Sequence, residues 1–265
     1  MSPTDRLHSR PGRETPDAHE RDTRLIWAGL FFSVAIFAQF PAADLLFSAR
    51  YFVPGQGFVH ADDAVVQWLY LWTPWLGRAL ILAVAFHAAF ARPISAGLRR
   101  LGRVAWADWT SGAGRRSAIL MVCASLLGPG LVIEGVFKHT VGRPRPVQVH
   151  EFGGHSTYQG PMAIGDEPGS HKSFCSSHAA TGFALMGLGL GCGPLWRRRW
   201  FLMGTVAGAI VGLGRIMQGG HFLSDIIFAF YAVWLSCEWV AWMDQRRTMR
   251  LAQQARIQPR TPPRA

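Results

Sequence analysis

The chain has 265 residues, 49% of them hydrophobic and 12% aromatic, which suits either a large apolar core or a set of membrane spans. Its net charge of +11 could indicate nucleic-acid binding, but the basic residues stand in short clusters at the ends of long apolar runs. That pattern is typical of topology signals in membrane proteins, so we expect a lipid bilayer around the chain and no nucleic-acid partner. The four cysteines lack paired metal-type spacing, and we expect no disulfide framework, zinc site or other cofactor.

Both ends of the chain are polar. Residues 1–24 contain almost no large apolar side chains, which predicts a disordered cytoplasmic tail. The first apolar run starts late and is long enough to span, so we expect an anchor rather than a cleaved signal peptide. Residues 244–265 form a basic cytoplasmic tail, with disorder expected over 251–265. The predicted membrane domain therefore occupies residues 25–243.

Six segments approach the roughly 20 mainly apolar residues that a membrane-spanning helix needs. They are Leu25 to Phe47, Val65 to Phe90, Ser117 to Phe137, Ala179 to Trp196, Trp200 to Gln218 and Phe222 to Met243. In the fourth and fifth segments, glycines four residues apart put small residues on one helix face, which favours close helix contact. The sequence thus predicts an all-α, polytopic membrane protein with six transmembrane helices. A soluble helical core is the alternative, but six such runs leave too little polar surface for it.

Arginine clusters predict the orientation of these spans. They precede the first span, fill the second and fourth connections and follow the last span, which places all of them on one side of a six-span protein. By the positive-inside rule we expect both termini to be cytoplasmic, with the protein in a cytoplasmic (inner) membrane. The first connection, Ser48 to Ala64, is expected to be either a short interfacial helix or a plain connector. Against this rule, Lys138, Arg143, Arg145 and Arg215 fall on the outer side, which favours a function for them.

The third connection begins with two of these cations. Lys138 lies at the predicted outer end of a span, and Arg145 follows it by seven residues. Pro144 and Pro146 keep the intervening backbone extended or turned, so that the chain can bring both cations to one anion. Arginine offers a planar fork to phosphate oxygens and lysine a point charge. Contact with lipid head groups is the simpler alternative.

A second polar cluster precedes the fourth span. Ser176, Ser177 and His178 stand where a Gly- and Ala-rich helix is predicted to start. Hydroxyl groups and unpaired backbone N–H groups at a helix N-terminus suit an anion. An ordinary serine N-cap is the simpler alternative.

The third cluster precedes the last span. His221 and Asp225 are four residues apart, which makes them neighbours on one helix face. Asp225 can accept a hydrogen bond from one ring nitrogen of His221, which leaves the other nitrogen free to attack. Arg215 lies six residues before His221 and can reach the same anion. A purely structural His–Asp pair remains the alternative.

Together, the order and spacing of the clusters resemble the phosphatidic acid phosphatase type 2 superfamily, a group of membrane lipid phosphatases related to acid phosphatases and haloperoxidases. The family signature is Lys, six residues, Arg-Pro; then Pro-Ser-Gly-His; then Ser-Arg, five residues, His, three residues, Asp. The matching residues are Lys138, Arg145, Ser176, His178, Arg215, His221 and Asp225, and the departures are Cys175, Ser177 and Gly214. The longer loop Val147 to Lys172 resembles that of bacterial lipid A phosphatases within this superfamily.

The resemblance implies a metal-independent mechanism through a phosphohistidine. His221 would attack phosphorus, Asp225 would orient it, and His178 would protonate the leaving oxygen and then activate water. The residues that would hold the phosphoryl oxygens are Lys138, Arg145, Ser176, Arg215 and, through its backbone N–H, Ser177.

We therefore expect a phosphatase that acts on a lipid phosphomonoester or pyrophosphate at the outer face of the cytoplasmic membrane. Candidate substrates are phosphatidylglycerol phosphate, undecaprenyl pyrophosphate, phosphatidic acid and lipid A. A phosphotransferase could use the same intermediate but pass the group to another lipid or sugar. A non-catalytic lipid-phosphate binding or transport protein would explain the spans and cations, but not His178 or the spacing of His221 and Asp225.

Overall fold

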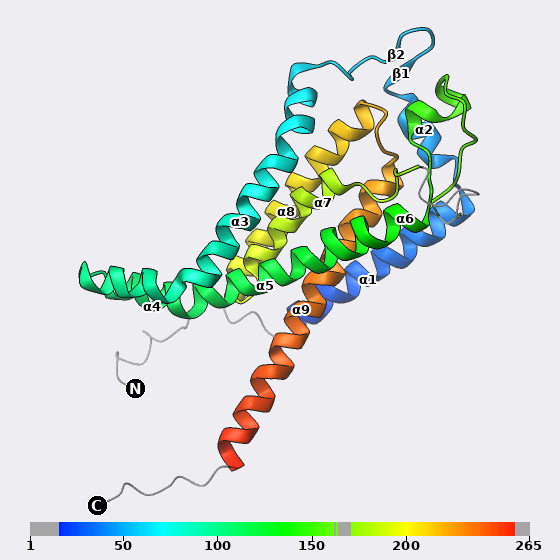
Figure 1. The fold of residues 1–265 in the computed structure, drawn as a ribbon. Coiled ribbons are helices and arrows are strands. Elements are labelled where there is room, and N and C mark those ends of the chain that lie inside the picture. Colours follow the sequence, from blue (N-terminus) through cyan, green and yellow to red (C-terminus); the bar gives the residue numbers. More distant parts are fainter. Residues whose placement is uncertain (1–15, 162, 164–170, 258–265) are drawn as a thin grey trace, which may run out of the picture.

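The structure is a computed structural model that describes residues 16–161, 163 and 171–257. Long helices run side by side in one bundle, and the strands of the described chain are confined to one short hairpin (Figure 1). The helices are α1 (Pro16–Gln39), α2 (Ala43–Ala49), α3 (Ala64–Arg100), α4 (Val104–Trp109), α5 (Arg115–Ser125), α6 (Lys138–Thr140), α7 (Ser177–Phe183), α8 (Pro194–Met217) and α9 (Leu223–Ile257). The predicted all-α membrane class is confirmed.

Shorter segments complete the helical elements. The π-helical segments η2 (Thr110–Gly114) and η3 (Leu126–Phe137) join α4, α5 and α6 into one continuous run. The 3-10 segment η6 (Ala184–Gly189) extends α7, and η4 (Pro146–Gln148) and η5 (His150–Phe152) lie in the long loop after α6.

Within the described residues, four helical runs are long and apolar enough to cross a membrane: Ala64–Arg100, Val104–Thr140, Pro194–Met217 and Leu223–Arg256. Large apolar side chains of α3 point away from the bundle, as expected where lipid is the solvent. They include Trp68, Leu71, Trp72, Trp75, Leu76, Leu82, Phe86 and Phe90. The chain is a multi-pass membrane protein.

The predicted count of six spans is not met, and the first reason is a bend in the first segment. The run Leu25 to Phe47 is divided into α1 and α2, which meet at 87°. Pro41 lies at the break, where it disfavours helical geometry for the preceding Phe40. Only if the bent pair is taken as one span does the count rise to five in the described chain.

The second reason is the shortness of the fourth segment. α7 and η6 have seven and six residues. At about 1.5 Å per α-helical and about 2.0 Å per 3-10 residue they reach roughly 22 Å, less than the hydrocarbon thickness of about 30 Å. Gly189, Gly191 and Gly193 end this helix because glycine weakens helices, and α8 starts at Pro194.

The predicted close contact through glycines is confirmed. A Cβ at Gly208 of α8 would lie 2.1 Å from the ring of Phe183 in α7, and a Cβ at Gly212 would lie 2.4 Å from Ile226 in α9. Both distances are shorter than carbon atoms tolerate. The two glycines therefore let α7 and α9 pack directly on the backbone of α8.

The first connection is neither of the two predicted alternatives. It forms an antiparallel hairpin of β1 (Phe52–Val53) and β2 (Gly57–Phe58), shown above α2 in Figure 1. The rings of Phe52 and Phe58 pack on Phe152 of η5, with centroids 5.1 and 5.4 Å away. The aromatic side chains thus tie the hairpin to the long loop.

Helix extends into parts of both predicted tails. α1 begins at Pro16 and α9 continues to Ile257, while residues 1–15 and 258–265 lie outside the described residues. Because adding a residue to an existing helix costs little, a membrane helix can continue into water without a core of its own. The limits of the predicted membrane domain, 25–243, stay a prediction.

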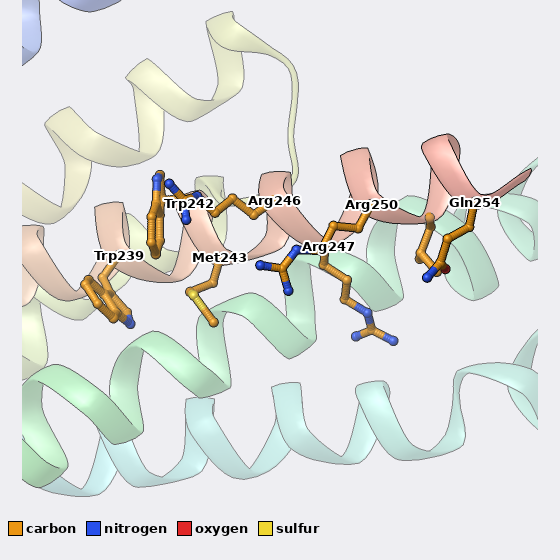
Figure 2. Close-up of a pocket in the computed structure, with 8 residues that line it drawn as sticks. Trp239, Trp242, Met243, Arg246, Arg247, Arg250 and Gln254 are labelled. Carbon is orange, nitrogen blue, oxygen red and sulfur yellow. The ribbon is translucent and has the colours of Figure 1, made fainter. Parts of the chain in front are cut away.

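The far half of α9 carries an open groove of tryptophan and arginine side chains, at the opposite end of the bundle from α2 (Figures 1 and 2). The guanidinium of Arg246 lies 3.9 Å from the ring centroid of Trp242. Nearby acids pair elsewhere, Asp244 with Arg116 and Glu238 with Arg197. Indole rings next to unpaired arginines are typical of the membrane–water interface.

Candidate functional site

The three polar clusters meet at one end of the bundle, around a fully buried carboxylate. Asp225, in the first turn of α9, accepts hydrogen bonds from the Ser173 hydroxyl at 2.6 Å and from the Phe222 backbone N–H at 2.9 Å. Oδ2 of Asp225 also lies 3.4 Å from Nδ1 of His221, which makes no hydrogen bond within the described chain. The two residues do not share a helix face as predicted, because His221 lies two residues before the start of α9. They meet instead as a close contact between buried groups.

The second histidine, His178, packs on an aromatic residue, Tyr70, that the sequence did not single out. The ring of His178, at the start of α7, stacks on Tyr70 of α3 with centroids 5.2 Å apart and planes at 22°. The guanidinium of Arg215 lies 4.5 Å from the centroid of the same Tyr70 ring. An aromatic side chain thus joins His178 to Arg215. Its position on an apolar helix far from the clusters gave no sequence signal.

Lys138, Arg145 and Arg215 form no ion pair with any carboxylate in the described part of the chain. Lys138 Nζ donates to the backbone carbonyl of Lys172 at 2.9 Å, and the guanidinium of Arg215 donates to Gln218. Lys138 and Arg215 are buried and Arg145 is half-buried. Buried cations without an acidic partner are expensive in a protein. They are therefore expected where an anion binds.

The charges of these cations reach both histidines. Burial lowers the pKa of His178 to about 4, and the positive charges of Arg215, Lys138 and Arg145 contribute to the decrease. Burial also lowers the pKa of His221 to about 3, with further lowering by Arg215 and Lys138, although Asp225 acts in the opposite direction. The lowered pKa values favour the neutral form of both rings at pH 7. An anion among the cations would favour protonation.

The structure adds a fourth cation, Arg143, that the sequence flagged but did not assign. Arg143 is fully buried and donates from Nη1 to Oδ1 of Asp225 at 2.5 Å and from Nη2 to Oδ2 of Asp44 at 2.7 Å. The charges of these two acids keep the pKa of Arg143 above its usual value, although burial alone would lower it. A signal was available, because Asp44 is an acid inside an apolar run and follows Pro41.

Two departures from the family signature, Ser177 and Gly214, fit their surroundings, as does Ser176, which matches the signature. Ser176 is the N-cap of α7, where its hydroxyl accepts from the N–H of Ala179 at 3.3 Å. The Ser177 hydroxyl donates to Glu134, and no non-glycine residue of the described chain has a positive φ. The serine at this position therefore causes no backbone strain. At Gly214 a Cβ would lie 3.4 Å from Leu69, an ordinary contact, so the glycine is not a steric requirement.

The segment that holds all of these motif residues, 118–249, matches the family model of the PAP2 superfamily. It belongs to this superfamily. The match confirms the predicted resemblance and covers α7, α8 and the membrane part of α9, which position His178, Arg215 and Asp225. No solved structure matches the chain.

Two relatives of the chain carry the same name. A lipid A 4'-phosphatase of Francisella tularensis subspecies novicida is 39% identical over 133 residues, which are 48% of this chain and 58% of that protein. A lipid A 4'-phosphatase of Rhizobium leguminosarum is 26% identical over 216 residues, 77% of this chain and 86% of that protein. The first match thus spans little more than half of the relative. Both names agree with the predicted lipid A phosphatase branch.

Proposed function

We propose that this PAP2 protein is an integral membrane phosphatase that hydrolyses a lipid phosphate through a phosphohistidine. The observation that carries the proposal is the group of Lys138, Arg145 and Arg215, which lack carboxylate partners in the described chain. Positive charges of this group also lower the pKa values of His178 and His221. A phosphoryl group would supply the missing negative charge. The cluster of cations lies at one end of a membrane bundle, a position that suits binding of a lipid head group.

In the first step, Nε2 of His221 forms a bond to phosphorus while the bond from phosphorus to the lipid oxygen breaks. Asp225 faces Nδ1 at 3.4 Å, which leaves Nε2 for the attack. The negative charge of the bound phosphate raises the pKa of His178, so that His178 can bring a proton to the leaving oxygen. The three cations stabilise the charge on the phosphoryl oxygens as it redistributes.

In the second step, water replaces the histidine. His178, now neutral, takes a proton from the attacking water, the new oxygen–phosphorus bond forms, and the bond from phosphorus to His221 breaks. Inorganic phosphate leaves, and the site returns to its starting state. Ser176 and the first backbone N–H groups of α7 would add donors for the phosphoryl oxygens. The cations supply the positive charge for both steps, so we propose that no metal ion is needed.

The distribution of arginine supports an outward-facing site. The pairs Arg116–Asp244 and Arg197–Glu238 join α5, α8 and α9 at the end of the bundle that also carries the groove of Figure 2. By the positive-inside rule this end is cytoplasmic, and the cluster of His178 and His221 at the other end faces outward. A reporter fused within residues 153–156 that proved cytoplasmic would overturn this orientation.

The names of the two relatives make lipid A the first substrate to test. Phosphatidylglycerol phosphate, undecaprenyl pyrophosphate and phosphatidic acid complete the panel. The experiment measures inorganic phosphate released by the purified protein in detergent, with EDTA present, from each lipid. The His221→Ala variant serves as the control, and we expect it to lose release by more than about a thousandfold while its melting temperature is kept.

Release by wild type and none by the variant would support the proposal and identify the lipid class. Equal release by both would remove His221 as the nucleophile. Phosphate transfer that depends on an added acceptor lipid, with little release to water, would instead assign a phosphotransferase. Binding of the lipids without either reaction would leave a lipid-binding protein.

A further inference from the structure

Three buried charges stand behind His221. Asp44, Arg143 and Asp225 come from α2, the loop after α6, and α9, and none of them has exposed surface. Nη1 of Arg143 donates to Asp225 and Nη2 donates to Asp44, at 2.5 and 2.7 Å. One guanidinium therefore forms ion pairs with two carboxylates. The face of Phe222 covers it, with the centroid 4.4 Å from Cζ of Arg143.

Asp44 is surrounded by hydrogen-bond donors. Its Oδ1 accepts from the Ser224 backbone N–H at 2.8 Å, and its Oδ2 accepts from the Ser224 hydroxyl at 2.5 Å as well as from Arg143. The hydroxyl of Tyr158 lies 3.4 Å from the same Oδ2 and donates to Pro41 at 2.6 Å. This set of donors suits an ionised carboxylate, which only accepts.

The charges of this group do not balance by themselves. With Asp44 and Asp225 ionised, two negative charges face one positive charge, that of Arg143. Attack on phosphorus makes the imidazole of His221 positive, and that charge would complete the balance. Because the group is buried, water does little to screen these interactions.

We propose that Asp44 is a positioning residue for phosphoryl transfer, which acts on His221 through Arg143 and Asp225. The negative charge of Asp44 offsets part of the positive charge of Arg143. Arg143 therefore neutralises Asp225 less, and Asp225 stabilises the imidazolium of His221 more strongly. Asp44 also fixes the place of Arg143, and its hydrogen bonds to Ser224 join α2 to α9. This inference rests on the proposed function.

Other charged groups also face these residues. His221 faces Arg215 of α8 and Lys138 of α6, whose positive charges oppose protonation of its ring. Asp44 faces Arg143, Asp225 and the hydroxyl of Tyr158. Changes at Lys138 or Arg215 would alter phosphate binding directly. Changes at Asp44 and Arg143 would not, so these two residues isolate the charge behind the nucleophile.

The first test is Asp44→Asn, which keeps the shape and removes one negative charge. We expect kcat for the lipid phosphate that wild type hydrolyses to fall about tenfold, with KM nearly unchanged, because Asp44 acts on the reacting group only through Arg143 and Asp225. The acidic limb of the pH profile of kcat/KM moves to lower pH, because the imidazolium of His221 loses stabilisation. If the asparagine variant does not fold, the smaller Asp44→Ser carries the same prediction.

The second test is the double variant Asp44→Asn with Arg143→Gln, which removes one negative and one positive charge. The net charge behind His221 returns to that of wild type, and the acidic limb is expected to return with it. Ser224→Ala is the matched control, since it removes hydroxyl contacts to both Asp44 and Arg143 but no charge. It should lower the melting temperature and leave the limb in place.

An NMR titration of His221, in protein with ¹⁵N-labelled histidine, measures the effect of Asp44 on the pKa of His221 without enzymatic turnover. The midpoint should fall in Asp44→Asn and recover in the double variant. An unmoved midpoint and limb in folded Asp44→Asn would overturn the inference, while phosphate release by wild type would still support the proposed function. Shifted midpoints in a wild-type protein that releases no phosphate would remove the proposed function and keep the electrostatic coupling.

Discussion

Four cations gather at the end of the bundle that holds His178 and His221, in two different environments. Arg143 is fully buried and forms ion pairs with Asp44 and Asp225, whereas Lys138, Arg145 and Arg215 form none with the described carboxylates. In the proposed orientation all four lie on the outer side, so the positive-inside rule alone does not separate them. The partners do: a cation that is already paired organises the protein, and cations that are not paired are available to an external anion.

The largest effect expected from this contrast is on stability at Arg143. Arg143→Gln leaves Asp44 and Asp225 buried without a counter-charge, and we expect the free energy of unfolding to fall by about 3–5 kcal/mol. Chemical or thermal unfolding in detergent measures it. Unchanged stability would mean that water or another group already neutralises the two acids.

Arg145→Gln tests the other side of the contrast. Because Arg145 has no acidic partner in the described chain, the loss of its charge should leave stability unchanged or slightly higher. We expect kcat/KM for the lipid phosphate to fall about a hundredfold to a thousandfold, as for other groups that stabilise transition-state charge. The two glutamine variants, measured side by side, form a matched pair. A loss of stability at Arg145 with activity kept would place it with Arg143.

The third prediction concerns pH. The pKa values of His178 and His221 are lowered by burial to about 4 and about 3, below the usual value of about 6.5 for an exposed histidine. The folded protein thus binds fewer protons than the unfolded chain, so this contribution to stability is complete above about pH 6.5 and is lost as the pH falls toward 4 and 3. Melting temperatures between pH 4 and 8 measure it. The variant with both histidines changed to asparagine should show a flatter curve.

The smallest effect is expected at Ser177. Ser177→Gly restores the usual residue of the family signature and removes only the hydroxyl that donates to Glu134. One such hydrogen bond is worth about 1 kcal/mol in net terms, a factor of about five, so we expect kcat to change by less than about fivefold. A larger change would show that Glu134 has a part in the reaction. Steady-state phosphate release decides between the two.

Local sequence patterns were sufficient to predict the fold class and the membership in the PAP2 superfamily. The apolar runs determined where helices form. The spacing of four residues placed His221 close to Asp225, although His221 lies before the first residue of α9 and not on its face. Glycines at Gly208 and Gly212 marked the close helix contacts. Each of these features depends on residues a few positions apart, which a periodic pattern can record.

The sequence did not determine the number of spans, because apolar length alone does not reveal a bend at Pro41 or a helix that ends at its glycines. It also did not reveal Tyr70 beside His178 or Asp44 beside Arg143. Asp44 and Arg143 are 99 residues apart, and their contact depends on how α2, the loop and α9 pack together. Whether a cation is paired or free is a property of that packing. Only the tertiary structure could therefore distinguish Arg143 from the three cations that have no carboxylate partner in the described chain.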